Sequence, residues 1–419
     1  MSPLIIATLV FVLAYVAIVF NVVHRTVVAL LGATLIIALG VLDQGQAFSA
    51  IDYNVIFLLV GMMVIANITG TTGVFQWLAI KAARVARGEP MRIMVLLCLI
   101  TALASAFLDN VTTVVLLVPV TLSIAATLGM NPVPLLVAEV ISSNIGGTAT
   151  LVGDPPNIMV GSAAGLSFTD FIVNLTPVAL VALGAFLVVA RFLFRKDLAI
   201  DPALKDRLDT IDTSGVITDN GLLRKCLIVL AIVVVGFLVH HLLHLEVATI
   251  ALFGAALLML ISGTGPLKAL RDVDWPTLFF FIGLFIIVGG IEEAGLVTIV
   301  GERALQLTGG DVALTSVAVL WFSGLASGVV DNIPYTAAMI PLIEELGGHM
   351  AVDTLWWALS LGACLGGNLT LIGASANVYA AGVSERAGHP ITFIGYLKYG
   401  AIATVLTLAI ATAFILLIV

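Results

Sequence analysis

Four short polar stretches interrupt an otherwise apolar sequence, and their residues could bind a proton, a cation or a small polar solute. The stretches 109–113 and 331–335 each begin with Asp-Asn between two apolar arms, and 146–157 and 366–377 are rich in Gly, Asn and Thr. An Asp in a membrane core costs about 2.5–3.5 kcal/mol, so acids there indicate a function. A helix N-cap, worth about 1 kcal/mol, is the alternative role.

Four acids are the candidates for proton or cation coupling. Asp109 and Asp331 begin the two Asp-Asn stretches, and we favour functional carboxylates over pure caps. Asp154 is the leading candidate, because Ala374 occupies the matching place in the second Gly-rich stretch. Glu139 also lies within an apolar span, either as a member of a proton path or as the partner of a nearby polar group.

Neutral amides and hydroxyls around the same stretches are the candidates for contact with a solute. Any single Ser or Thr hydroxyl could instead satisfy a local backbone carbonyl, and the clustering is what favours binding. The candidates are Asn110, Thr112, Thr113, Gly147, Thr148, Asn157, Asn332, Gly367, Asn368, Thr370, Ser375 and Asn377.

The elements that position these residues are predicted to be membrane-spanning helices. Of 419 residues, 61% are hydrophobic and 10% are charged, whereas soluble proteins carry about 45–50% apolar and about 25% charged residues. This composition excludes a soluble enzyme, a disordered protein and a nucleic-acid binder, whose contacts need clustered Lys and Arg. Apolar runs long enough to cross a membrane lie at 4–20, 26–42, 54–69, 171–190, 226–240, 247–262, 275–290 and 393–419.

The second half of the chain repeats the first. The matched stretches are 52–61 with 274–283 and 109–119 with 331–341, both at an offset of 222 residues, and 146–157 with 366–377 at 220 residues. Biased composition is the alternative explanation, and a fixed order at a nearly fixed spacing argues against it. We therefore predict an all-α polytopic membrane protein with repeats at 1–194 and 226–419, joined by a linker at 195–225.

The four remaining apolar stretches complete each repeat. If 91–128 and 312–346 are re-entrant hairpins, while 134–165 and 354–384 are broken helices that cross, each repeat has five crossings and the second repeat must be inverted. About ten transmembrane segments and two hairpins result. Residues 74–87 and their repeat mate 296–308 are predicted to be helices that lie in the two membrane interfaces.

The distribution of positive charge predicts the orientation. Under this topology sixteen of the 17 Lys and Arg residues, Arg25 among them, fall on or near one face, and Arg303 falls on the other. The positive-inside rule makes the first face cytoplasmic. We predict a multi-pass protein of the plasma (inner) membrane with both termini outside, a cytoplasmic linker, and no Lys or Arg near the centre of a broken segment.

The cysteines and histidines give weaker evidence of a functional site. Cys98, Cys226 and Cys364 lack a paired spacing and are expected to be small core residues, although Cys364 precedes the second broken stretch and is the one to test against a thiophilic solute. Residues 240–244 carry three His at a helix end, where facing water is the commoner role. No metal and no cofactor are predicted.

The strings AFLDNVTTVVLLVPV (106–120) and AEVISSNIGGTATLVGDPPNIMVG (138–161) resemble the arsenite permease, sodium/proton antiporter and P-protein branch of the ion transporter superfamily, and are most similar to P-protein-like sequences. Through the repeat, the resemblance covers nearly the whole chain. It implies a secondary transporter with scaffold and transport domains that move by an elevator, and a homodimer. More distant dicarboxylate carriers carry Ser-Asn-Thr where this chain has Asp-Asn, which argues against sodium-coupled dicarboxylate uptake.

The favoured function is efflux of arsenite or antimonite coupled to proton entry. Arsenite is mostly neutral at pH 7, which suits a cleft of hydroxyls, amides and helix ends without a basic clamp. A sodium/proton antiporter and an organic anion or silicate transporter of the same superfamily stay open, and a channel is a rival from another class. No catalytic motif of a membrane enzyme is found within a span, so the chain is not predicted to be an enzyme. The predicted partners are the solute, protons and the bilayer, and the sequence does not determine whether an ATPase subunit binds.

Overall fold

The computed structural model describes residues 2–20, 22–198 and 215–419, and their regular structure is helical. Eight of these helices are long and apolar enough to cross a membrane, and several shorter apolar helices join them. The helices are α1 (Pro3–Val19), α2 (Arg25–Ala38), α3 (Gln44–Ser49), α4 (Tyr53–Gly70), α5 (Val74–Val85), α6 (Pro90–Phe107), α7 (Asn110–Thr127), α8 (Val133–Gly147), α9 (Pro155–Ala164), α10 (Phe168–Leu193), α12 (Asn220–Leu243), α13 (Val247–Ser262), α14 (Pro266–Arg271), α15 (Trp275–Glu293), α16 (Leu296–Thr308), α17 (Val312–Val330), α18 (Asn332–Gly347), α19 (Asp353–Gly366), α20 (Ser375–Arg386) and α21 (Phe393–Ile418).

In the core, helices of one repeat pack against helices of the other. Helix α4 packs against α13 and helix α15 packs against α2, so each long helix pairs with a helix of the other repeat. Gly61 and Gly283 permit the close approach: a Cβ on Gly61 would lie 2.7 Å from the carbonyl carbon of Ala251, and one on Gly283 would lie 2.6 Å from that of Ala29. The predicted repeat pairs therefore occupy equivalent places in the fold.

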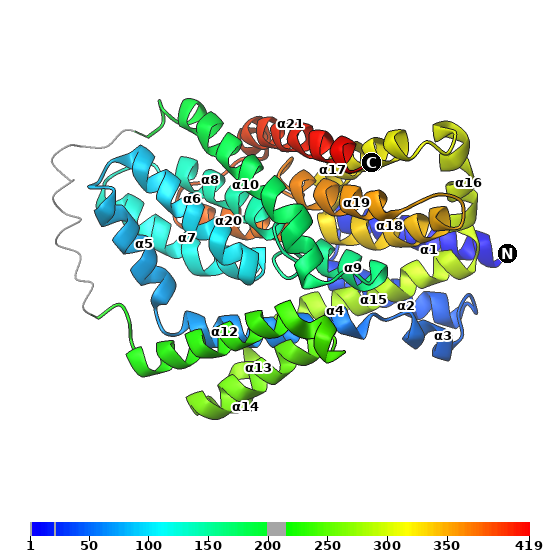
Figure 1. Cartoon of the computed structure of the whole chain (residues 1–419), viewed down its shortest axis with the longest axis horizontal. Coiled ribbons are helices and arrows are strands. Elements are labelled where there is room, and N and C mark those ends of the chain that lie inside the picture. Colours follow the sequence, from blue (N-terminus) through cyan, green and yellow to red (C-terminus); the bar gives the residue numbers. More distant parts are fainter. Residues whose placement is uncertain (1, 21, 199–214) are drawn as a thin grey trace.

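Two hairpins enter the molecule from opposite ends. The arms α6 and α7 lie in the left half of Figure 1, nearer the grey trace, and α17 and α18 lie in the right half. Asp109 separates the first pair of arms and Asp331 the second, and each acid caps the returning helix. The predicted hairpins at 91–128 and 312–346 are present, and the arms α6, α7 and α17 are each long enough to cross a membrane, so their re-entry stays a prediction.

The broken helices have the predicted interruptions. Helix α8 ends at Gly147 and α9 begins at Pro155, and α19 ends at Gly366 and α20 begins at Ser375. Pro155 and Pro156 lack an N–H and therefore fit the first turn of α9, where no intrahelical acceptor is available. Five of the predicted spans correspond to helices long enough to cross a membrane, which are α4, α10, α12, α15 and α21, and the runs at 4–20, 26–42 and 247–262 form the shorter apolar helices α1, α2 and α13. The predicted broken segments and the all-α inverted-repeat fold are confirmed.

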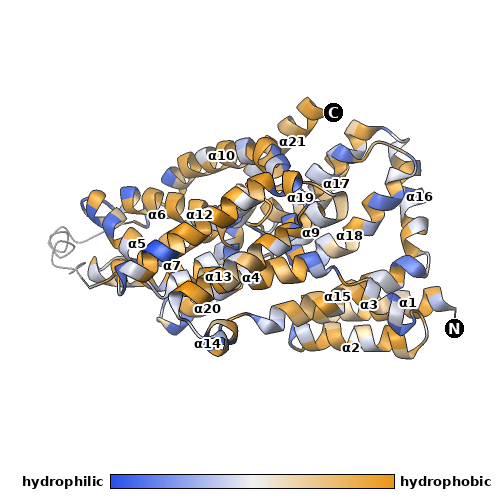
Figure 2. Ribbon diagram, turned by 60° about the horizontal axis from the view of Figure 1, so that its bottom comes forward, coloured by the Kyte–Doolittle hydropathy of each residue, from blue (hydrophilic) through white to orange (hydrophobic). Residues whose placement is uncertain are grey.

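Two amphipathic helices mark the ends of the molecule. Helix α5 lies at the left end and α16 at the right end of Figure 1, and hydrophilic residues gather in both and at helix ends (Figure 2). Residues 199–214 of the predicted linker lie outside the described residues. The linker end that is described lies beside α5, because Thr218 N donates to Thr72 O at 3.1 Å.

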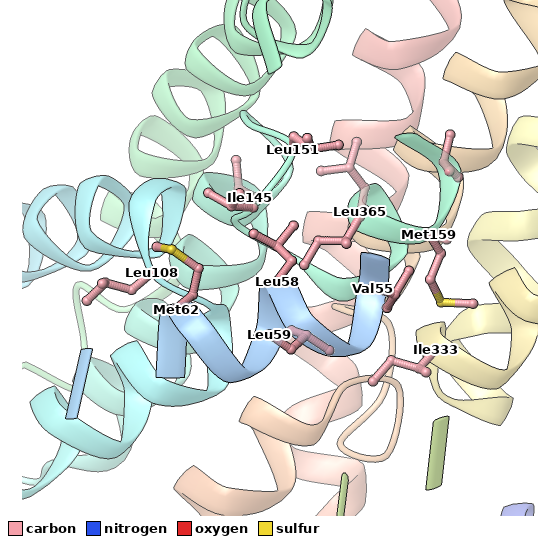
Figure 3. Packing of buried hydrophobic residues seen from close by; sticks show 14 of the residues in the cluster. Val55, Leu58, Leu59, Met62, Leu108, Ile145, Leu151, Met159, Ile333 and Leu365 are labelled. Carbon is pink, nitrogen blue, oxygen red and sulfur yellow. The ribbon is translucent and has the colours of Figure 1, made fainter. Parts of the chain in front are cut away.

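The face of α4 that covers the hairpin tips and broken helices is apolar. Figure 3 shows Val55, Leu58, Leu59 and Met62 of α4 directed towards side chains from those elements, which are Leu108, Ile145, Leu151, Met159, Ile333 and Leu365. Leu58 and Leu59 are buried. Burial and dispersion therefore hold α4 against the hairpin tips and broken helices, whereas α1 and α2 contact the second tip through hydrogen bonds from Tyr15 and Arg25.

Candidate functional site

The first hairpin tip is held by its own helix. The Asp109 carboxylate accepts a hydrogen bond from Thr112 N at 2.8 Å and another from the Thr112 hydroxyl. Its backbone is extended, with φ −80°, and the residue is buried. In the described residues no Lys or Arg pairs with Asp109, so local N–H and O–H groups are what stabilise it.

The second tip is held by a cation from the other repeat. Asp331 Oδ2 lies 3.2 Å from an Arg25 terminal nitrogen, which also donates to Ser375 Oγ at 2.6 Å. The Arg25 guanidinium also donates to Thr277 and stacks over the Phe280 ring. Asp331 has φ +87°, a strained backbone for a residue other than Gly, and these contacts hold it there.

The unwound loops between the broken helices are clasped by matching asparagines. Asn157 Nδ2 donates to the carbonyls of Gly147, Thr148 and Thr150. Asn377 Nδ2 does the same for Gly367 and Thr370 at 2.8 and 2.9 Å. The symmetry of these contacts shows that both amides satisfy carbonyls that the end of a helix leaves open.

An amide network joins the two loops across the repeats. Asn144 Nδ2 donates to Asn368 Oδ1 and to Asn377 Oδ1, both at 3.0 Å, and Asn144 Oδ1 accepts from Asn110 Nδ2 at 3.1 Å. Two atoms of this network, Asn110 Oδ1 and Asn368 Nδ2, are buried without a hydrogen-bond partner in the described residues. One acceptor and one donor are thus open beside a common hub.

Asp154 lies within this cluster. Its carboxylate is fully buried and accepts from Asn332 Nδ2 at 3.2 Å, although the side chain does not cap its own helix α9. Asp109 and Asp331 both act on it electrostatically. The Cys364 thiol interacts with it and donates to Asn157 Oδ1 at 3.2 Å. Asp154 therefore links the first broken loop to Asn332 of the second hairpin tip.

A cavity of about 310 Å³ lies beside this cluster. Asp109, Thr112, Arg25 and Ser375 are among its lining residues. Asn67, in the last turn of α4, also lines it, and the Thr72 carbonyl that contacts the linker lies a few residues further along the chain. The hairpin tips are therefore accessible from the linker side.

A second cavity, of about 220 Å³, lies at the opposite end. It is lined by Asp52, Glu292, Glu344, Met159 and Pro341 among others. Asp109 lines the first cavity and not this one, so the two cavities differ in their access to the first hairpin tip.

The predicted solute-binding residues fall into two groups. Ten of them, Asn110, Thr112, Gly147, Thr148, Asn157, Asn332, Gly367, Asn368, Ser375 and Asn377, belong to the tips, loops and network described above. Thr370 donates its hydroxyl to Gly328 O in α17, so it satisfies a backbone carbonyl of a different helix. Thr113 is buried with an unpartnered hydroxyl. Glu139 lies apart, between Thr101 and Thr121.

The expectation of a site without a basic residue is wrong. The charge distribution predicts that Arg25 lies at the cytoplasmic face. The structure places its side chain, 25% exposed, against Asp331 and the cavity. Its repeat position is occupied by Val247. The same asymmetry that singles out Asp154 is therefore the sequence signal that could have identified Arg25.

The sequence pattern does not identify Asn144 as a site residue either, because it lies inside α8, within an apolar span. Its repeat position holds Cys364, so one repeat supplies the amide hub and the other a thiol. The histidines at 240–244 line a separate cavity with Glu246. In the described part of the chain no group of three or more His, Cys, Asp and Glu residues could hold a metal ion.

Comparison with known proteins adds a family and a fold. The profile of a family described as citrate transporter (CitMHS) matches residues 15–362. An uncharacterized transporter of Mycobacterium tuberculosis is 47% identical over 419 residues, covering 98% of this chain and 97% of the relative. The P protein of Homo sapiens is 34% identical over 481 residues, and the match covers 94% of this chain and 57% of the P protein.

A solved structure has the same architecture. The YdaH transporter of Alcanivorax borkumensis superposes with a TM-score of 0.64 at 13% identity, and the match covers 98% of this chain and 97% of that one. At this identity the likeness concerns the fold alone. The family match and the relatives show that the chain is a multi-pass membrane transporter.

Proposed function

Because the chain belongs to the citrate transporter family of the ion transporter superfamily, we propose that it is a secondary active transporter that exports arsenite or antimonite in exchange for protons. In this proposal the linker side is cytoplasmic, both termini are outside, and the protein resides in the plasma (inner) membrane. The transported solute binds at the amide network, and the acids around it carry the protons.

The observation that carries this proposal is the pair of open atoms in the amide network. Asn110 Oδ1 can accept a hydrogen bond and Asn368 Nδ2 can donate one. A neutral trihydroxide has O–H donors and oxygen acceptors on one small molecule, so it can satisfy both atoms without an added charge. Asp154 and the Cys364 thiol lie beside Asn332 and Asn157, where trivalent arsenic would find an oxygen or sulfur ligand.

Proton coupling follows from the excess of acids. Asp109 lines the linker-side cavity, Asp154 interacts electrostatically with Asp109 and Asp331, and Arg25 is the cation that pairs with Asp331. Three buried carboxylates near one guanidinium repel one another unless a proton or a cation binds. Asp154, which caps no helix and forms no ion pair in the described residues, is the best placed of the three to take up and release a proton.

Alternating access is consistent with the two unequal cavities. Asp109 lines the linker-side cavity and not the opposite one, so in this proposal transport requires the tips and broken helices to move past α4 and α15. The apolar face of α4 (Figure 3) offers no directional contacts that would fix one position. An elevator in which the tips and broken helices slide along this face fits these features.

Two other functions are each favoured by one observation. Arg25 at the cavity gives a carboxylate-bearing solute one charged partner, which favours a citrate-like organic anion. The three acids favour exchange of sodium for protons. A citrate-like anion must also approach Asp109 and Asp154, which opposes its binding, and silicate, another neutral hydroxide at pH 7, would use the arsenite contacts.

The test is a solute panel in everted membrane vesicles, which turn the proposed efflux into uptake. Vesicles that contain the protein and maintain an acidic lumen are offered arsenite, antimonite, silicate, citrate or sodium, while a dye reports lumenal pH. We expect arsenite and antimonite to accumulate and to consume the proton gradient. Sodium-driven proton movement without arsenite dependence, or citrate accumulation alone, would contradict the proposal.

A matched control separates transport at the site from leakage. Cys364→Ser replaces the thiol next to Asn157 Oδ1 with a hydroxyl. We expect this variant to transport silicate as well as the wild type does. Its affinity for arsenite should be weaker than that of the wild type. Equal loss of all solutes would indicate damage to the fold.

A further inference from the structure

The interior of the bundle formed by α6, α7 and α8 holds an acid that the site above does not use. Glu139 is 1% exposed. Its Oε1 accepts from the Thr121 hydroxyl at 2.9 Å, and the Thr101 hydroxyl lies 3.5 Å from the same atom. Glu139 Oε2 has no hydrogen-bond partner in the described residues. Half of this carboxyl group is therefore buried without compensation.

No cation balances the charge of this carboxylate in the described residues. Helix α7 carries no titratable residue and Glu139 is the one in α8, while α6 contributes Cys98, which faces Glu139, and Arg92, which pairs with Glu89. Helices α10, α19, α20 and α21 also pack against α8. Their titratable residues, none of which has an ion pair or hydrogen bond to Glu139, are Asp170, Arg191, Asp353, Cys364, Tyr379, Glu385, Arg386, Tyr396, Lys398 and Tyr399.

The matching place in the second repeat is not acidic. Leu359 corresponds to Glu139 and Ile343 corresponds to Thr121. Ser323, the counterpart of Thr101, pairs instead with the Tyr335 hydroxyl at 3.1 Å. The second bundle forms with apolar residues at these positions, so a carboxyl group is not required to build this fold.

A second buried polar side chain lies one turn further along α8. Ser142 Oγ has no N–H or O–H partner in the described residues, and the Cys98 thiol interacts with it. Residues three apart in a helix lie on the same face. A proton on Oε2 would supply an O–H donor on the face that carries the Ser142 oxygen.

From this asymmetry we propose that Glu139 is a second proton-binding site, carried inside the first hairpin bundle and distinct from the aspartates at the tips. A proton adds to Oε2 of the carboxylate, which becomes a neutral carboxyl group, and the same proton leaves when the site is exposed to the side of lower proton concentration. Glu139 does not line the linker-side cavity, so the proton is enclosed in this conformation. Its contribution to coupling rests on the proposed function, whereas proton binding itself does not.

Infrared difference spectroscopy on the purified full-length protein tests proton binding without any solute. We expect a band of a buried protonated carboxyl that disappears reversibly as the pH is raised from 5 to 9. Glu139→Gln should remove this band, while Glu385→Gln, at an exposed acid of α20, should leave it unchanged. A band that persists at every pH means a permanently protonated structural group and would overturn the proposal, as would an unchanged spectrum in Glu139→Gln.

A measurement on the wild type keeps the proposal testable if Glu139→Gln does not fold. A hydrophobic carbodiimide adds to a protonated buried carboxyl, and peptide mass spectrometry locates the adduct. We expect labelling of the peptide that contains Glu139 to fall about tenfold for each pH unit above the midpoint of its titration. Absent or pH-independent labelling would contradict proton exchange at this residue.

The consequence for transport distinguishes this site from the proposed function. If the vesicle panel shows coupled transport, Glu139→Gln should retain solute transport and move one proton fewer per solute than the wild type. An unchanged number of protons would contradict the coupling contribution of Glu139. If no solute is transported, the spectra and the labelling still decide whether Glu139 binds a proton.

Discussion

The two hairpin tips both begin with Asp-Asn and have different surroundings. Asp109 has a relaxed backbone at φ −80° and is satisfied by Thr112 of its own helix. Asp331 has φ +87° and pairs with Arg25 and Ser375, which belong to other elements. The first tip can therefore form within its own repeat, whereas the second depends on a helix from the other repeat. Identical motifs in a duplicated fold need not have identical roles.

The two broken loops differ in the same way. Their backbone clasps are equivalent, with Asn157 and Asn377 holding matching carbonyls. In contrast, the residue that corresponds to Asp154 in the other repeat is Ala374. Asp154 accepts a hydrogen bond from Asn332 of the second tip. Shared contacts build the fold, and the unshared acid and cation give the site its polarity. The predictions below test this division.

Removal of the unshared acid should have the largest effect. Asp154→Asn keeps the shape of the side chain and an acceptor for Asn332, but it cannot exchange a proton. We expect coupled transport in the vesicle assay to fall about a hundredfold or more, with normal folding. The control is Asp170→Asn, an acid outside the site that caps α10. Unchanged pH dependence of transport between pH 5.5 and 8 in Asp154→Asn would remove this residue as the proton carrier.

Removal of the unshared cation should destabilise the second tip. Arg25→Gln leaves the Asp331 carboxylate, whose side chain is 14% exposed, without a cation, at a cost of about 2–3 kcal/mol. Unfolding in mixed micelles measures this loss. Arg25→Lys should retain part of the stability, and Asp331→Asn in the Arg25→Gln background should restore most of it. Additive losses in the double variant would contradict a direct pairing.

Substitution at the shared glycines should affect both repeats alike. A Cβ at Gly61 or Gly283 meets backbone atoms of α13 or α2 at less than the ordinary contact distance. We expect Gly61→Ala and Gly283→Ala each to lower the free energy of unfolding by about 2 kcal/mol. Gly184→Ala is the control, because nothing lies within 4 Å of a Cβ there, and it should be neutral or slightly stabilising. A large difference between the first two variants would contradict the equivalent packing.

Truncation of the tip amides should have smaller and unequal effects. Asn332→Ala removes the donor to the Asp154 carboxylate, and we expect about a tenfold loss of arsenite affinity. Asn110→Ala removes a neutral contact with Asn144 and the open Oδ1 atom, and about a threefold loss is expected. Thermal stabilisation by arsenite in each variant measures the affinity. A greater loss in Asn110→Ala would reverse the assigned roles of the two tips.

The repeat could be predicted from the sequence because residues that break helices have their effect where they stand in the chain. Gly, Pro and Asp-Asn recur at fixed offsets, and each interruption occurs where those residues predict it. The acid at 154 could be identified because its repeat position is Ala374. Thus the hairpin tips, the broken loops and the candidate acids all followed from short stretches of sequence.

The rest of the site depends on contacts between distant elements. Arg25 reaches Asp331 because α2 packs against α15 and the second tip lies beside both, and the pair is separated by 306 residues. Asn144 is a hub because Asn368 and Asn377 come to it from the other repeat. Span counting treats both residues as parts of helices and contains no information about which helices meet.

The most direct test of the central claim is proton exchange on binding of arsenite to the purified protein. Isothermal titration in buffers with different ionisation enthalpies measures the protons taken up or released for each arsenite bound. We predict proton exchange that depends on pH in the wild type, and arsenite binding without that exchange in Asp154→Asn. No binding of arsenite to the wild type, or binding with no movement of protons, would contradict a shared site for solute and proton at the meeting point of the two repeats.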